Sequence, residues 1–508
     1  MSGAELPASL GASSPDGDGP HEPTPPDEGR PDETTGALAR VAATFTRWAE
    51  RFIPDAFVFA LVATVLVVVA GIVVRTSAVS TLTASREVVM AWGGGFWDLV
   101  PFTMQMALVI ITGYVLATTR PVYRLIAALA SIPRAPRPAI AMVALFAMIS
   151  SWFNWGFSLI FSAMLAKEIA RRVQNVDYRA VAASAFLGLG SIWAQGLSGS
   201  AALQMATGAA LPDGVRKIVA GSEGQIPGGI IPLSRTIFLW QSLTAVAIEI
   251  ALVTLVVYLA VPSAARARTA SQMGIDLGVS PLDRKDPERR GTPGEWLEHV
   301  PVLNLLFVAL SVAYLAIYFG QAKHKLDAIN LNTINLVFLT FGVALHGTPA
   351  RLMRAVKEAT PGVWGVILQF PFYAGIASII VKTGLNERLA HLFAGISGQR
   401  SFPAVIAIYS AVLGVFVPSG GSKWVIEAPY VMQAAHDLKV NLGWMVAVYD
   451  LGEALANLVQ PFWMLPILGL FGLRARDVMG YTFLVFLVLA PVVLVLVTVL
   501  GATLAYPM

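Results

Sequence analysis

Charged residues are scarce in this sequence. Only 13% of the 508 residues are Asp, Glu, Lys or Arg and 56% are hydrophobic, whereas soluble globular proteins carry about 25% charged residues. The short alternating segments of a membrane β-barrel are also missing. Apolar runs near the length of about 20 residues that crosses a bilayer recur along the chain, for example at 57–74, 237–261 and 483–504. The sequence therefore predicts an all-α polytopic membrane protein.

Other absences exclude further classes of protein. There is no cysteine, so disulfides and thiol chemistry are excluded. No P-loop and no H-E-x-x-H motif occurs, and the six histidines fall in loops, in the tail or at the ends of predicted spans. We therefore expect neither an intramembrane enzyme nor a cofactor. The net charge of +4 fits basic cytoplasmic loops, and no nucleic-acid-binding pattern accompanies it.

Composition divides the chain into five parts. Residues 1–36 are rich in Pro, Gly, Asp and Glu and lack apolar periodicity, which predicts a disordered cytoplasmic tail. A polar stretch at 262–298 predicts a cytoplasmic linker. It follows a first membrane repeat, 37–261, and precedes an unmatched linking helix, 299–325, which leads into a second repeat, 326–508.

Two apolar stretches are interrupted near their centres. These stretches, 139–166 and 403–435, are predicted to be re-entrant hairpins that enter and leave the membrane on one side. With the N-terminus in the cytoplasm, 22 of the 35 Lys and Arg residues fall in cytoplasmic segments and 11 in external ones. This bias follows the positive-inside rule and predicts an external C-terminus. The predicted spans are 54–75, 99–118, 181–208, 233–261, 301–320, 329–346, 362–383, 443–470 and 481–506.

The two halves of the chain repeat one order of segments. At an offset of 265 residues, Pro138 corresponds to Pro403 and Asn154 to Ser419. Each half contains two spans, a hairpin, a broken span and a final span, and the unmatched helix between the halves reverses the orientation of the second. Inverted repeats of this kind occur in secondary transporters, which bind substrate near the midplane at the repeat interface.

Irregular polar backbone is predicted at two hairpin tips, 150–156 and 417–424, and at breaks in the spans near 191–200 and 457–461. Such backbone is tolerated at membrane depth only when it is buried in protein or lines a wet cavity, where helix N-termini attract carboxylates and carbonyls bind cations. Close helix packing would explain one hairpin, but two at matching positions favour a binding site. The predicted substrate-binding residues are Ser151, Trp152, Asn154, Trp155, Ser198, Ser200, Ser419, Gly420, Gly421, Ser422, Asn457 and Gln460, and those predicted to couple Na⁺ or H⁺ are Asn154, Gly196, Ser419, Glu453 and Pro461.

Three ionisable residues in these segments need a partner or a role, because a charge at the bilayer centre costs about 2.5–3.5 kcal/mol. Lys423 and Glu427 lie one helical turn apart, so we expect them to neutralise each other; attraction of an anion by Lys423 is the alternative. Glu453 is expected to couple a cation or proton, with a structural hydrogen bond as the alternative. Tryptophans near the tips are expected to line a pocket for an alkyl chain or to pack the core.

Uncommon aromatic and glycine motifs occur in these segments: WGGGFW at 92–97, FTMQMAL at 102–108, SWFNWGF at 151–157, SGS at 198–200, VPSGG at 417–421, and Asn457 with QPFW at 460–463. In these motifs and their order the sequence resembles the bacterial short-chain fatty acid transporter family, from about residue 40 to the C-terminus. The resemblance implies membership of the ion-transporter superfamily and uptake of small monocarboxylates such as butyrate or acetoacetate across the inner membrane. It also implies a homodimer that works by an elevator-like motion. Lys423 and Glu427 stand where the family has neutral residues, so a transporter of a different organic acid is the alternative.

Overall fold

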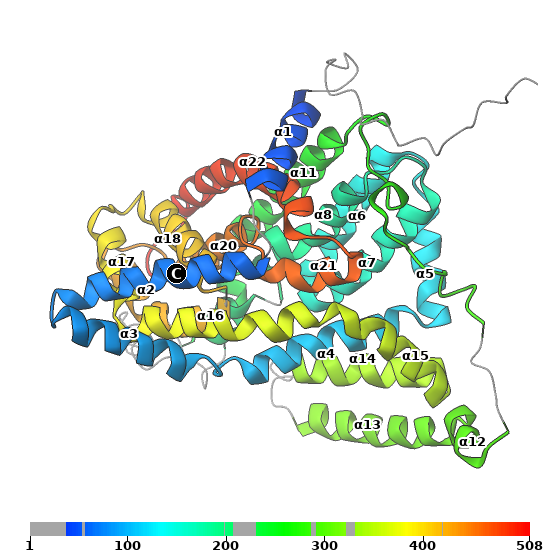
Figure 1. The fold of residues 1–508 in the computed structure, drawn as a ribbon. Coiled ribbons are helices and arrows are strands. Elements are labelled where there is room, and N and C mark those ends of the chain that lie inside the picture. The colour runs from blue at the N-terminus through cyan, green and yellow to red at the C-terminus, as the bar shows by residue number, and fades with distance from the viewer. Residues whose placement is uncertain are drawn as a thin grey trace, which may run out of the picture.

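The computed structural model is built from helices and their connections (Figure 1). No strand occurs in the part of the chain that it describes, so the predicted all-α fold is confirmed. The predicted disorder of the tail at 1–36 falls outside that part. The described residues are 37–52, 56–197, 199–206, 230–285, 291–321, 331–418 and 420–508.

Seven helical segments among the described residues are long and apolar enough to cross a membrane. Two bent pairs raise the number of spans to nine if each pair is one span: α4 with α5, bent by 81°, and α20 with the segment that contains α21, bent by 71°. The chain is therefore a multi-pass membrane protein. The seven segments are α2 (Ala56–Thr76), α6 (Pro136–Phe153), the stretch Tyr178–Ala206, α11 (Trp240–Ala260), α13 (Val302–Gln321), α16 (Trp364–Lys382) and α22 (Ala475–Gly501).

The other helices are shorter, or belong to the hairpins and the bent spans. They are α1 (Ala37–Phe52), α3 (Thr81–Gly95), α4 (Val100–Ala117), α5 (Arg120–Ala130), α7 (Trp155–Arg172), α8 (Tyr178–Leu187), α9 (Ser200–Ala206), α12 (Pro293–His299), α14 (Leu331–His346), α15 (Pro349–Ala359), α17 (Leu385–Gly395), α18 (Phe402–Phe416), α19 (Gly420–Asp437), α20 (Leu442–Asn457) and α21 (Leu465–Phe471).

Both predicted hairpins are pairs of helices that double back on themselves. In the first, Ser158 Oγ on α7 donates to the carbonyl oxygen of Ala147 on α6 at 2.7 Å, so the two arms lie side by side. In the second, Lys423 Nζ on α19 donates to the carbonyl oxygen of Ser410 on α18 at 2.9 Å. The two arms of each hairpin run antiparallel, so the beginning and the end of the hairpin lie on the same side, opposite its tip.

Each hairpin is followed by a span that loses its α-helical geometry midway. After α8 the chain passes through a π-helical turn, Gly188–Ile192, and a 3₁₀ turn, Trp193–Gln195, before α9 begins. In the second half, α20 ends at Asn457 and a 3₁₀ turn, Phe462–Met464, precedes α21. Both breaks occur where the sequence predicts them, and the order of hairpin, broken span and final helix is the same in both halves.

The first broken span lies at the centre of the molecule. In its most apolar stretch, 94% of the residues are buried, compared with 22% in α2 and 11% in α13. In Figure 1, α13 lies at the edge of the molecule beside α14. Because lipid tails are apolar, the exposed leucines and valines of α2 and α13 are suited to face lipid.

The helix α3 occupies a region that the sequence analysis leaves as a loop, residues 76–98. Its buried residues, Ala84, Val88, Ala91 and Gly95, recur on one helical face. On α16, Ser378 Oγ donates to the carbonyl oxygen of Ala91 at 2.7 Å. The stripe consists mostly of small residues, so it gives a weak hydrophobic signal in the sequence although the helices approach closely.

Replacing Gly452 by alanine should destabilise the crossing of α18 and α20. An added Cβ would lie 2.3 Å from the carbonyl oxygen of Ala407 and 2.8 Å from Ser410 Cβ, so Gly452→Ala should cost about 1–3 kcal/mol. The measurement is the Tm of the purified protein in detergent. Gly320→Ala on α13 is the matched control, since nothing lies within 4 Å of its added Cβ. Equal Tm values for both variants would contradict the close crossing.

Candidate functional site

The first hairpin turns at a single extended residue. Asn154 has φ −157° and ψ 116°, and its Oδ1 accepts a hydrogen bond from the backbone N–H of Phe157 at 2.8 Å. The side-chain oxygen therefore caps α7, and the amide NH₂ group is the donor that remains. Beside it, Ser151 is fully buried, Trp155 is nearly so, and Trp152 is half-buried.

The tip of the first hairpin is bonded to the break of the first span. The carbonyl oxygen of Trp152 accepts a hydrogen bond from the backbone N–H of Leu197 at 2.7 Å. Gly196 permits this approach, because an added Cβ would lie 2.0 Å from the same carbonyl oxygen. The structure thus brings Trp152 and Gly196 together, while Ser198 lies outside the described residues.

A carboxylate that the sequence analysis did not select also lies at this break. Gln195 Nε2 donates to Glu249 Oε2 at 2.8 Å, and Glu249 on α11 is fully buried. The available signal was a lone acidic residue within the predicted span 233–261, but the sequence does not indicate which break this residue faces.

The second hairpin reaches the first broken span. Gln204 Nε2 on α9 donates to the carbonyl oxygen of Gly421 at 3.0 Å. An added Cβ on Gly420 would lie 2.9 Å from the Trp193 ring and 3.7 Å from Ser200 Oγ. The tip of one half therefore lies against the break of the other half. Ser419 and the side chain of Ser422, both predicted site residues, lie outside the described part of the structure.

The two breaks also contact each other. Asn457 Nδ2 donates to the carbonyl oxygen of Leu189 in the π-helical turn at 3.1 Å, and Asn457 Oδ1 accepts from Gln460 Nε2 at 3.0 Å. Gln460 Oε1 in turn accepts from the backbone N–H of Phe462 at 2.6 Å. These fully buried amides replace the helical hydrogen bonds that are lost at Pro461. In this conformation, Asn457 and Gln460 hold the break in shape.

The charged residues pair differently from the expectation. The Lys423 ammonium forms a buried ion pair with Glu453 on α20, and Glu427 accepts a hydrogen bond from the Tyr409 hydroxyl. Lys423 is thus paired with a carboxylate of the adjacent helix, and Glu427 is bonded to the other arm of the hairpin; neither partner was expected from the sequence. Asp450, one turn before Glu453, accepts from the backbone N–H of Ala202 at 3.4 Å.

Three tryptophans form an aromatic layer around the meeting point. The ring centroids of Trp155 and Trp463 are 5.5 Å apart, and those of Trp193 and Trp463 are 6.3 Å apart. The rings come from the first hairpin and from both breaks, so they provide an apolar wall beside polar backbone.

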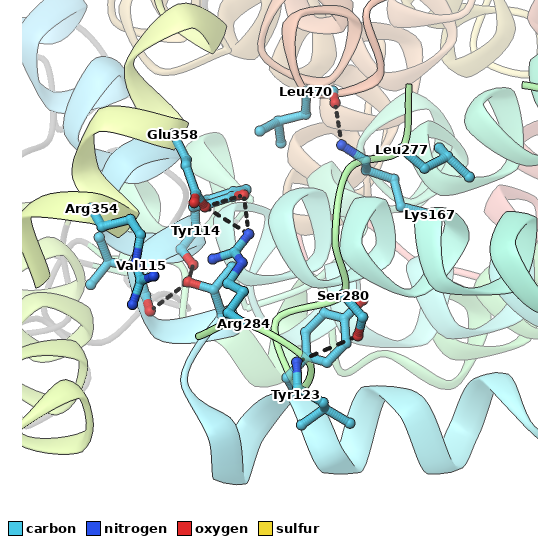
Figure 2. Close-up of polar contacts among 12 residues, drawn as sticks. Tyr114, Val115, Tyr123, Lys167, Leu277, Ser280, Arg284, Arg354, Glu358 and Leu470 are labelled. Carbon is cyan, nitrogen blue, oxygen red and sulfur yellow. Dashed lines mark hydrogen bonds and ion pairs between the residues drawn. The ribbon is translucent and has the colours of Figure 1, made fainter. Parts of the chain in front are cut away.

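A second polar region lies at the end of the first hairpin away from its tip (Figure 2). Arg284 of the linker pairs with Glu358 on α15 at 2.7 Å, and Arg171 on α7 donates to the carbonyl oxygen of Leu277 in the same linker. A cavity of about 640 Å³ is lined by these side chains together with Lys167 and Asp276. The sequence does not indicate that Arg171, Arg284 and Glu358 join the linker to α7 and α15.

Hairpin tips packed against broken spans within an all-helical, multi-pass protein define a membrane transporter. The chain belongs to the short-chain fatty acid transporter family, which it matches over residues 37–500. The family resemblance of the sequence is thereby confirmed, and so is the expectation that the protein is not an enzyme.

Relatives in two bacteria, both provisionally named short-chain fatty acid transporters, are similar along most of the chain. The Escherichia coli K12 protein is 35% identical over 445 residues, which cover 87% of this chain and 96% of the relative. The Haemophilus influenzae protein is 33% identical over 458 residues, which cover 90% and 99%.

Two solved transporters have a similar arrangement at 15% sequence identity. The YdaH transporter of Alcanivorax borkumensis aligns with a TM-score of 0.43 over 89% of this chain and 98% of its own. MtrF of Neisseria gonorrhoeae, described as illuminating a class of antimetabolite efflux pumps, aligns with a TM-score of 0.39 over 91% and 99%.

Substitution of Gly196 should detach the first hairpin tip from its break. Gly196→Ala places a methyl group against the Trp152 carbonyl, which should cost about 1–3 kcal/mol. Hydrogen exchange at the Leu197 amide should then be roughly tenfold to a hundredfold faster. The control is Gly365→Ala, where the nearest atom to the added Cβ is at an ordinary 3.6 Å. Unchanged exchange in Gly196→Ala would show that the tip does not depend on this contact.

Proposed function

We propose that this transporter is a secondary active symporter that takes up short-chain fatty acids and other small monocarboxylates, such as butyrate or acetoacetate, across the bacterial inner membrane. The observation that carries the proposal is the convergence of both hairpin tips on the broken spans. Family membership and the provisional names of the two relatives support the substrate class.

The substrate carboxylate is proposed to bind between the hairpin tips and the breaks. The amide NH₂ of Asn154 is a suitable donor, because its oxygen is engaged in capping α7. The aromatic layer of Trp155, Trp193 and Trp463 suits a short alkyl chain. The other proposed contacts are Ser151, Trp152, Ser198, Ser200, Ser419, Gly420, Gly421 and Ser422; Asn457 and Gln460 join them only when the breaks rearrange, because their amides are engaged in this conformation.

The proposed coupling ion is Na⁺ or H⁺. Carbonyls near Gly196 and Pro461, together with Asn154 and Ser419, are proposed to contact the ion. Glu453 is proposed to contribute charge only in a conformation in which its ion pair with Lys423 is broken. If protons drive uptake, Glu249 is the better-placed carboxylate, because its partner Gln195 is neutral whereas Glu453 already contacts an ammonium.

A transporter of a differently charged acid was the alternative because of Lys423 and Glu427. Both side chains have buried partners in other helices, so this ground for another substrate is weakened. The orientation proposed from the charge bias keeps the N-terminus cytoplasmic and the C-terminus external. The proposed working unit is a homodimer embedded in lipid, in which the hairpins move together by an elevator-like displacement.

The substitution Asn154→Asp separates capping from substrate binding. Aspartate retains the oxygen that caps α7 but replaces the NH₂ donor with a negative charge that repels a carboxylate. We expect the variant to fold with a Tm lowered by the added charge, and at least a roughly tenfold loss of butyrate uptake in proteoliposomes, equivalent to about 1.4 kcal/mol. Asn154→Ala should lose both the cap and the uptake, and Ser419→Ala should lose uptake. Wild-type uptake by folded Asn154→Asp would remove this amide from the site.

Counterflow of labelled butyrate and acetoacetate, under separately imposed Na⁺ and proton gradients, tests the function directly. We expect exchange of both monocarboxylates, with net accumulation driven by one of the two gradients. Accumulation of a dicarboxylate but of neither monocarboxylate would contradict the proposed substrate class. Accumulation that neither gradient stimulates would contradict symport.

A further inference from the structure

The Lys423 ammonium is enclosed by oxygen atoms in the second half of the protein. It lies in the first turn of α19 and its side chain is 1% exposed. Ser410 on α18 accepts from it twice, through the carbonyl oxygen at 2.9 Å and through Oγ at 3.1 Å. Glu453 on α20 supplies a carboxylate oxygen, and the Tyr449 ring lies 4.9 Å from Nζ.

These neighbours are the ligand types of a hard monovalent cation. Carbonyl, hydroxyl and carboxylate oxygens bind Na⁺ in transporters, where hairpins and broken helices supply them, and an aromatic face adds attraction for any cation. Here the oxygens come from one hairpin arm and from the broken span that follows the hairpin. The ammonium on the other arm thus joins the hairpin to the span.

The surrounding residues leave space for this charge, and a neighbouring carboxylate on α20 has a partner of its own. On α18, Gly414 faces the pair, and an added Cβ would lie 3.1 Å from Glu453 Oε2 and 3.3 Å from Lys423 Nζ. Asp450 is turned towards the backbone N–H of Ala202 on α9. Glu453 is thus the carboxylate on α20 that Lys423 neutralises.

Stability alone does not require an ion pair here. A buried pair is often no more stabilising than well-packed apolar residues, but removal of one partner leaves an uncompensated charge. Ionised Glu453 therefore needs some cation whenever the hairpin lies against α20. A mobile ion would have to bind and leave in each cycle, whereas a covalently attached ammonium stays in place.

We propose that the Lys423 ammonium is a built-in cation, which fills the position where a free Na⁺ would otherwise neutralise Glu453. The second hairpin then docks on α20 without taking up Na⁺ at that position. This inference rests on the proposed function only for its consequence for coupling. The occupancy of the position by the ammonium can be tested without any substrate.

The first experiment measures stabilisation by Na⁺ in purified protein. Lys423→Ser removes the ammonium and leaves a space that Na⁺ and water can fill beside Ser410 and Glu453, so replacing choline chloride by NaCl should raise the Tm of this variant by about 2 °C or more. The same exchange should raise the Tm of the wild-type protein and of Lys439→Ser by a smaller amount, equal in the two, which reports any Na⁺ bound elsewhere in the protein. Lys439 is the matched control, because it is exposed and its ammonium lies over the ring of Tyr506 at 4.7 Å. Equal Na⁺ responses in Lys423→Ser and wild type would overturn the proposal.

A double variant keeps the test decisive if Lys423→Ser is unstable. Lys423→Met/Glu453→Gln removes both charges, so it should fold and its Tm should respond to Na⁺ no more than that of wild type. If the double variant folds but Lys423→Ser does not fold even in Na⁺, the ion has failed to replace the ammonium and the proposal is wrong. A Na⁺-dependent rise in the Tm of the double variant that exceeds the rise in wild type would also overturn it.

Uptake measurements separate this inference from the proposed function. When choline replaces Na⁺ on both sides of the membrane, the rate of monocarboxylate uptake by Lys423→Ser should fall by a factor at least fivefold larger than the factor by which wild-type uptake falls. An equal loss in both proteins would count against the inference. If wild type transports no monocarboxylate, the proposed function fails, whereas the Tm comparison still decides the role of Lys423.

Discussion

Unpaired backbone groups cannot be left in contact with lipid, and the two breaks in the spanning helices create several of them. In this protein the breaks are satisfied by each other and by the hairpins. Leu197 donates to the Trp152 carbonyl, and Asn457 donates to the Leu189 carbonyl. The site therefore depends on mutual hydrogen bonding between four irregular segments, none of which is stable at membrane depth alone.

Small residues make this mutual bonding possible. An added Cβ on Gly188 would lie 2.2 Å from the Ala147 carbonyl oxygen, and one on Gly196 would lie 2.0 Å from the Trp152 carbonyl oxygen. Without these glycines the first hairpin could not approach the first broken span. Gly452 serves the same purpose between α18 and α20. Glycines at these positions therefore allow both the close packing of the hairpins and the conformation of the breaks.

Much of the architecture follows from local sequence. The helix-breaking residues around Asn154 and before Trp463 predict the tips and breaks, because Pro461 removes a helical N–H and the asparagine cap starts a new helix. Contacts between side chains on different helices could not be predicted in this way. Lys423 and Glu427 are one turn apart, yet the ion pair of Lys423 is with Glu453, 30 residues further along the chain. Local spacing gives no distance between helices, so Gln195–Glu249 and the buried face of α3 could not be predicted either.

The linker connects the first hairpin to α15 through two anchors and so limits the distance between them. It is held to α7 at Leu277, by Arg171, and to α15 at Arg284, by Glu358. The two anchors are seven positions apart in the sequence, a span that a fully extended chain covers in about 25 Å. While both anchors remain intact, the linker therefore limits any displacement of the first hairpin relative to α15, including the elevator-like displacement proposed above.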